Sequence, residues 1–123
     1  MNDSTMADFA ASTELLKKAY AAFNARDLDG ALATMRPDVD WPNGMEGGTV
    51  HGHEGVRAYW TRQWKMINPH VDPVGFTLDP AGRLEVSVHQ VIRELSGKVL
   101  MDRMVQHIYT LEGGLIQSME IRE

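Results

Sequence analysis

Residues 84–111 read LEVSVHQVIRELSGKVLMDRMVQHIYTL, with apolar and polar side chains alternating on both sides of Ser96-Gly97. Successive side chains of a strand point to opposite faces of a sheet, so this alternation predicts strands at 84–94 and 99–111. Serine and glycine are typical of tight turns. The two strands are therefore expected to form an antiparallel hairpin.

The register of this hairpin decides which side chains share a face. Pairing Glu94 with Val99 fixes the partner of every other residue, and it makes Gln90 and Arg103 direct cross-strand neighbours, close enough for a hydrogen bond. The more apolar face is expected to look inward, and it carries Leu84, Val86, Val88, Gln90, Ile92, Met101, Arg103, Val105, His107 and Tyr109.

A last extended run, 115–122, follows the turn Glu112-Gly113-Gly114. A three-residue loop there pairs Leu111 with Leu115 and turns Met119 toward the inward face. A two-residue loop would bury polar side chains of the last strand instead. We therefore expect the longer loop.

Upstream of the hairpin the apolar residues recur at helical spacing. They do so in 12–26, 28–35 and 56–66, and an extended run at 71–78 precedes the hairpin. Helices followed by an antiparallel meander are typical of α+β domains. We predict an α+β fold with a curved, mostly antiparallel sheet and three N-terminal helices packed on its concave face.

Length and composition indicate a single globular domain. The chain has 123 residues, of which 43% are hydrophobic and 24% charged,. We expect 1–11 to be flexible and 12–123 to form the domain. The formal net charge of -5 argues against a nucleic-acid partner or an anionic membrane surface,. No apolar run approaches the roughly 20 residues of a membrane span. With no leader-like N-terminus and no cysteine, a cytoplasmic location is expected,.

The 8 Met and 3 Trp are more large, adaptable apolar side chains than so small a core usually takes,. We expect several of them to wall a pocket. Polar residues on the same inward face fit a ligand site with a few convergent polar groups, although a packed core that satisfies them is the alternative. The candidate ligand-binding residues are Tyr20, Trp41, Trp60, Trp64, Gln90, Met101, Tyr109 and Met119.

Four segments together resemble one known family. They are NARDLDG (24–30) after an amphipathic helix, PDVDW (37–41), GHEGVRAYW (52–60) and YTLEGGLI (109–116). The chain resembles the SnoaL-like branch of the nuclear transport factor 2-like superfamily, which includes ketosteroid isomerases, polyketide cyclases and limonene epoxide hydrolases. The resemblance covers about 12–122. It implies a cone-shaped, cystatin-like roll around one apolar cavity and a homodimer formed through the sheet.

The resemblance also implies positions for the isomerases' working residues. Their tyrosine donor would fall at Ala19, next to Tyr20, and their aspartate base would fall at Trp41, which cannot abstract a proton. Their second donor, a protonated aspartic acid, would fall at His107 if the last turn is one residue shorter here. The steroid isomerase mechanism is therefore not expected. His107 as acid/base and Arg103 as a clamp for an acidic or carbonyl group are the candidate catalytic residues.

Two functions stay open. One is an isomerase-, cyclase- or hydrolase-like enzyme acting on a small apolar carbonyl or acidic compound, and the other is a non-catalytic module that binds or senses such a compound. No cofactor is expected. His51 and His53 are spaced to chelate a metal, but no third ligand is supported by spacing, so no metal site is expected either. The half-apolar outer face, with Val91, Leu100 and Met104, fits a homodimer interface.

Overall fold

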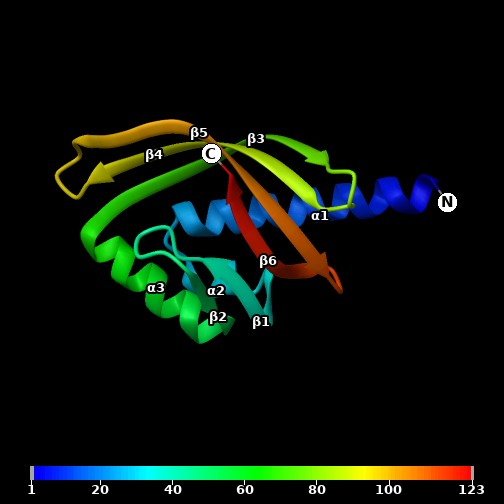
Figure 1. Cartoon of the computed structure of the whole chain (residues 1–123), viewed down its shortest axis with the longest axis horizontal. Coiled ribbons are helices and arrows are strands. Elements are labelled where there is room, and N and C mark those ends of the chain that lie inside the picture. The colour runs from blue at the N-terminus through cyan, green and yellow to red at the C-terminus, as the bar shows by residue number, and fades with distance from the viewer. Residues whose placement is uncertain (1, 123) are drawn as a thin grey trace.

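A six-stranded sheet forms the centre of the structure, a computed structural model that describes residues 2–122. The strands follow the order β2-β1-β6-β5-β4-β3, and the pair β1–β6 is parallel while the other neighbours are antiparallel. The sheet curls into an arch (Figure 1). The strands are β1 (Met35–Pro42), β2 (Thr49–His51), β3 (Ile67–Leu78), β4 (Leu84–Glu94), β5 (Val99–Glu112) and β6 (Leu115–Arg122).

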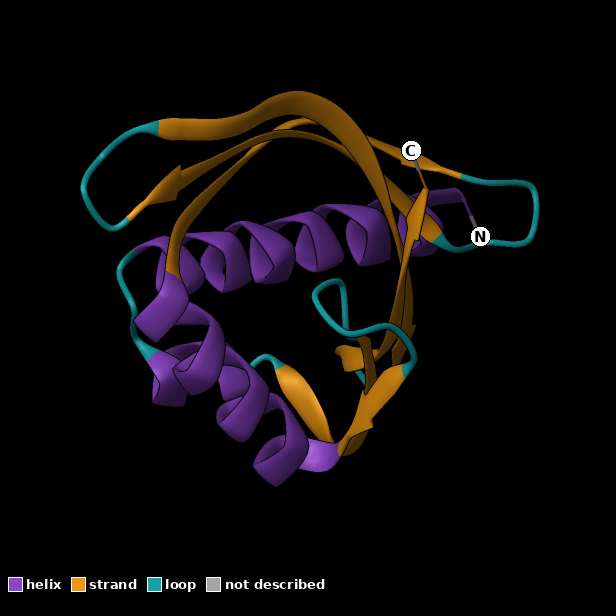
Figure 2. Cartoon of the chain, turned by 60° about the vertical axis from the view of Figure 1, so that its left-hand side comes forward, coloured by secondary structure: helices purple, strands orange, loops and turns teal. Residues whose placement is uncertain are grey.

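Three helices lie on the concave side of the arch (Figure 2): α1 (Asn2–Asn24), α2 (Leu28–Leu32) and α3 (Gly52–Met66). The predicted α+β class, with helices packed on a curved and mostly antiparallel sheet, is confirmed. Within residues 2–122, no helix is long and apolar enough to cross a membrane.

Several helix boundaries differ from the predicted ones, and α3 begins at Gly52 rather than at Val56. The first helix begins at Asn2 rather than at Ser12, since alanine-rich sequence favours helix upstream of the amphipathic part,. That the first eleven residues are flexible in solution stays a prediction. The second helix ends at Leu32 because the chain turns at Thr34, whose hydroxyl donates to the carbonyl of Ala31 at 2.6 Å, and then enters β1.

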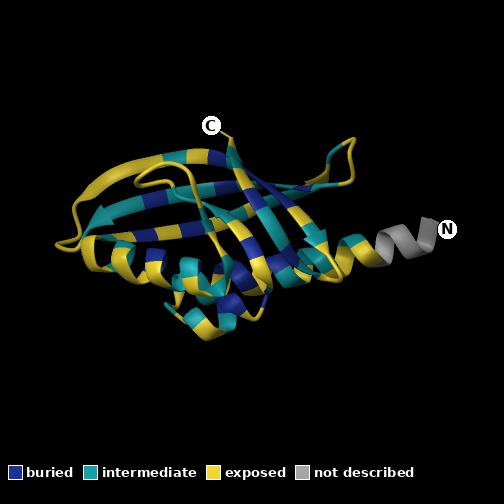
Figure 3. Cartoon of the chain, turned by 60° about the horizontal axis from the view of Figure 1, so that its bottom comes forward, coloured by how far each residue is buried: buried dark blue, intermediate teal, exposed yellow. Residues whose placement is uncertain are grey.

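The hairpin of β4 and β5 has the predicted register over most of its length. Leu84 pairs with Tyr109, and the same register continues to Ile92 with Met101. The predicted pair of Glu94 with Val99 is wrong, because a bulge at this end of the hairpin pairs Arg93 with Val99 instead. Buried and intermediate positions alternate along the first part of β4, whereas the first part of β5 is mostly exposed (Figure 3).

The turn between β5 and β6 has two residues, and the predicted three-residue loop is wrong. Gly113 and Gly114 both have positive φ, 62° and 81°, which is the backbone of the tight hairpin turn that glycine favours,. A bulge leaves Gln117 without a partner on β5. Because the extra residue reverses the alternation once, Met119 faces inward as predicted, opposite Tyr109,.

Candidate functional site

A cavity of about 200 Å³ lies between the helices and the concave face of the sheet. Every ligand-binding or catalytic candidate from the sequence lines it except Trp64. The lining residues are Ala19, Tyr20, Phe23, Met35, Trp41, Pro42, Gly44, Met45, Tyr59, Trp60, Gln63, Ile67, Val71, Gln90, Ile92, Met101, Arg103, His107, Tyr109, Met119 and Ile121.

Trp64 lies outside this lining. Its ring centre is 5.4 Å from that of Phe23 and 5.8 Å from that of Trp60, and the guanidinium of Arg26 stacks over it at 5.1 Å. Trp60 and Trp64 share a helix face, but one turn of α3 carries the second ring past the end of the cavity and onto α1. The placement of Trp64 in the pocket is therefore corrected.

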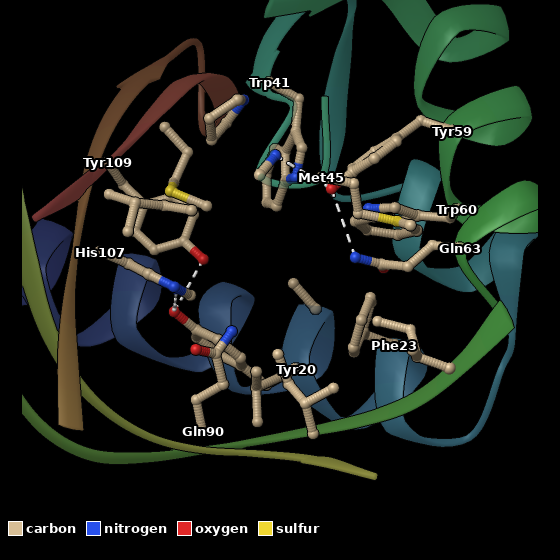
Figure 4. Close-up of a pocket in the computed structure, with 18 of the residues that line it drawn as sticks. Tyr20, Phe23, Trp41, Met45, Tyr59, Trp60, Gln63, Gln90, His107 and Tyr109 are labelled. Carbon is tan, nitrogen blue, oxygen red and sulfur yellow. Dashed lines mark hydrogen bonds between the residues drawn. The ribbon is translucent and has the colours of Figure 1, made fainter. Parts of the chain in front are cut away.

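Three polar side chains form a buried hydrogen-bonded chain at one side of the cavity (Figure 4). The hydroxyl of Tyr109 donates to the hydroxyl of Tyr20 at 2.8 Å, and the Tyr20 oxygen lies 2.8 Å from Nδ1 of His107. Tyr20 comes from α1, while His107 and Tyr109 are two positions apart on β5 and so share its inward face,. All three residues are at least 95% buried.

Burial keeps all three groups neutral at neutral pH. It lowers the pKa of His107 to about 4, because the imidazolium loses its hydration inside the protein,. It also raises the pKa of Tyr20 and of Tyr109 above the ordinary value for a phenol. The chain is thus a set of neutral donors and acceptors rather than an ion pair.

This chain leaves one donor over, whichever ring nitrogen of His107 carries the proton. If Tyr20 donates to Nδ1, the proton on Nε2 of His107 is left. If Nδ1 donates to Tyr20, the hydroxyl proton of Tyr20 is left instead. Among residues 8–122, whose side chains the structure describes, neither group has a further hydrogen-bond acceptor, and both residues line the cavity. An acceptor atom on a bound molecule can complete the chain.

Gln90 and Arg103 form a second polar pair on the cavity wall. Nε of Arg103 donates to Oε1 of Gln90 at 3.0 Å, and the two residues are opposite each other on β4 and β5, which confirms the predicted neighbours. Arg103 also borders a surface hollow of about 450 Å³ that includes Asp40 and Glu120. It therefore lies where the inner cavity meets the surface.

Tyr59 and Gln63 line the cavity but were not among the candidates from the sequence. The Tyr59 hydroxyl accepts hydrogen bonds from the backbone N–H of Gly44 at 3.0 Å and from Nε2 of Gln63 at 3.3 Å. The available signal was their spacing: they are four residues apart on α3 and flank Trp60, so their polar ends lie on the same helix face. Apolar patterning assigned that face to the core.

The two histidines considered for a metal have separate partners. Nδ1 of His51 lies 2.7 Å from a carboxylate oxygen of Asp40, and Nε2 of His53 donates to the backbone carbonyl of Met35 at 3.0 Å. In the described part of the chain, no three His, Asp or Glu side chains come together as a metal site would require,.

Comparison with known proteins gives a consistent result. The family model described as SnoaL-like domain matches residues 16–119. No curated protein matches the chain. TerC, crystallised with polyporic acid, is 28% identical at a TM-score of 0.79, over 90% of this chain and 89% of TerC. An NTF2-like protein of unknown function from Burkholderia pseudomallei is also 28% identical, with a TM-score of 0.79 over 91% of this chain and 89% of that protein. An NTF2-like protein from Burkholderia xenovorans is similar in fold. It is 21% identical, with a TM-score of 0.75 over 92% of this chain and 88% of that protein.

Proposed function

The chain belongs to the SnoaL-like family, and from that premise we propose that it is an isomerase-, cyclase- or hydrolase-like enzyme for a small apolar carbonyl or acidic compound. The observation that carries this proposal is the donor left over by Tyr20 and His107 at a mostly apolar cavity. A carbonyl or enol oxygen of the bound compound is the acceptor that this donor lacks.

The chemical contribution of the pair is to stabilise negative charge on that oxygen. A donor held in place before the reaction stabilises a developing oxyanion strongly, because the surroundings are apolar and no reorganisation is needed. The raised pKa of Tyr20 keeps its hydroxyl protonated, so it stays a donor. His107, neutral at pH 7, acts as acid/base by taking a proton from an acidic substrate and returning it to another atom of the same compound,.

The substrate must itself contain an easily ionised hydrogen. Trp41 stands where the isomerases have their base, and His107, with a pKa of about 4, is a weak one. A compound that is already enolic or acidic needs little help to lose a proton. Arg103 with Gln90 holds the acidic group of such a compound, since guanidinium binds carboxylates and enolates well,. The relative crystallised with polyporic acid supports an acidic ligand.

The test begins with a thermal-shift screen of small apolar acids, enols and ketones, followed by an assay of each hit for turnover by chromatography. We expect Tyr20→Phe and His107→Gln to lose both binding and turnover, and Arg103→Ala to weaken acidic hits more than neutral ketones. Arg57→Gln, which removes an exposed ion pair with Asp29, is the matched control. Hits that bind all variants alike would overturn the proposal.

The second candidate function is a non-catalytic module that binds or senses the same compounds. The observation in its favour is Trp41, which contacts Trp60 edge to face at 5.4 Å and offers no acid or base. In that case binding depends on Tyr20, His107 and Arg103, yet no hit is converted. Turnover of any hit rules this candidate out.

We further propose a homodimer formed through the outer face of β4 and β5. Met104 is 51% exposed there, on the same face as the buried Val91 and Ile108, and Leu100 in the bulge at the hairpin end is 52% exposed. Exposed apolar side chains next to buried ones make a continuous surface that a second copy can cover. The family resemblance supports the same interface.

A further inference from the structure

The cavity has a second polar side, opposite the chain of Tyr20 and His107. Figure 4 shows Tyr59 and Gln63 of α3 across the space from His107, with the edge of Trp41 between the two sides. Tyr59 is 97% buried as a whole residue, but its hydrogen bonds are only partly buried, whereas those of Tyr20 are fully buried. Polar atoms that are shielded from water are normally hydrogen-bonded, so a donor without an acceptor in such a place indicates a candidate ligand contact.

The hydrogen bonds of Tyr59 leave a donor unused. A phenol has two lone pairs and one proton, and the lone pairs of Tyr59 accept from the N–H of Gly44 and from Nε2 of Gln63,. Its proton has no acceptor among residues 8–122, the part of the chain with described side chains. With the Gln63 amide turned over, Tyr59 donates to Oε1 and the amide N–H groups of Gln63 are left instead. A donor is left over on this side in either case.

The space between the two sides is narrow and aromatic. The ring of Trp60 meets Trp41 edge to face at 5.4 Å and Phe23 at 5.0 Å, which gives the cavity flat apolar walls,. Its volume is about 200 Å³. Because a cavity of about 150 Å³ holds benzene, this one has room for one or two rings and not for a four-ring compound.

We propose that the cavity selects one- or two-ring aromatic compounds that carry oxygen atoms at two opposite ends, one bound by Tyr20 and His107 and the other by Tyr59 and Gln63. This inference rests on the proposed function for the first end and adds the second. Tyr59 and Gln63 are then specificity-determining residues. A compound with both oxygens at one end leaves one donor pair without a partner, which is costly in a buried site.

Two naphthalenediols test this as a matched pair. The 2,6-isomer carries its hydroxyl groups at opposite ends and the 2,3-isomer carries both at one end, with equal size and polarity. Isothermal titration calorimetry should give a Kd about fivefold lower for the 2,6-isomer, the effect of one net hydrogen bond. The double variant Tyr59→Phe with Gln63→Leu removes both donors of this end and should reduce that preference to near unity. Tyr20→Phe should weaken both isomers.

Arg62→Gln is the control for indirect effects of a looser loop between β1 and β2. Arg62 pairs with Glu46 of that loop but does not line the cavity, so this variant should retain the preference for the 2,6-isomer. Equal affinities in the wild type, or a preference that the double variant leaves intact, would overturn the two-ended site alone. Failure of both isomers to bind, or binding that Tyr20→Phe leaves unchanged, would overturn the proposed function as well.

Discussion

The hydroxyl of Tyr20 lies 2.8 Å from Nδ1 of His107, although 87 positions separate the two residues in the chain. This hydrogen bond joins α1 to β5 inside the cavity, where apolar contacts alone would allow the helix to slide. The same bond that orients the helix therefore orients the donor offered to a ligand. Stability and binding depend on the same atoms here.

Replacing either tyrosine of the chain should cost stability, but by different amounts. Tyr20→Phe leaves both His107 and Tyr109 without their partner, whereas Tyr109→Phe removes one donor and leaves Tyr20 with His107. We expect the free energy of unfolding to fall by about 2 kcal/mol for the first and about 1 kcal/mol for the second. Urea denaturation of both variants measures this. Equal losses would contradict the central position of Tyr20, which bonds to both His107 and Tyr109.

Stability should fall as the pH drops from about 6.5 to about 4. The pKa of His107 is about 4 in the folded protein and ordinary when unfolded, so between these values the unfolded state binds one proton more and is favoured by acid,. The loss from this group is on the order of 3 kcal/mol. His107→Gln should remove this part of the pH dependence in urea titrations from pH 7 to 4. A variant with the wild-type profile would refute the assignment.

Shortening Trp41 should enlarge the cavity and relax its size limit. Trp41→Leu removes a ring that packs on Trp60 at 5.4 Å and on Tyr109 at 6.3 Å, at a cost of about 2 to 3 kcal/mol in stability,. Hydroxyanthracenes, too long for the wild-type space, should then bind. Calorimetry on both proteins decides the matter. Binding of three-ring compounds to the wild type would show that Trp41 does not set the limit.

The homodimer predicts a particle of twice 13.8 kDa at micromolar concentration. Leu100→Lys combined with Met104→Lys should give a folded monomer, since two charges on the outer face prevent its burial against a second copy,. Met66→Lys on α3, equally exposed but away from the sheet, is the control. Light scattering that finds a monomeric wild type, or a dimer that the double variant leaves intact, would contradict the proposal.

The inward face of β4 and β5 was predictable because alternation over many residues tolerates only one register with one face buried. Gln90, Arg103, His107 and Tyr109 were therefore found from sequence. The bulges were not predictable, since each depends on the backbone of its turn and leaves no recognisable pattern of apolar and polar residues in the sequence. Both of these turns were wrong in detail, yet the faces of Gln90, Arg103, His107, Tyr109 and Met119 were right. At the start of β6 the face was wrong, because Ile116 and not Leu115 lies opposite Leu111.

Helical spacing was less informative at the site. It identified the face of α3 that contains Tyr59, Trp60, Gln63 and Trp64, but a helix face is wider than the cavity. Which of those side chains meets the cavity depends on where α1 crosses, and that follows from packing between segments far apart in sequence. Phe23 of α1 and Arg26 in the turn after α1 cover Trp64, whereas Tyr59 lines the cavity.

The bulge at Gln117 has a consequence for how related chains are aligned. Removing this residue alone would leave Ile116 and Ser118 opposite the partners that they already have, with every later side chain of β6 on its present face. A relative with a regular strand therefore differs from this chain by a one-residue gap at Gln117, not in the Gly113-Gly114 turn. Placing the gap in the turn would compare residues that do not occupy the same place in space.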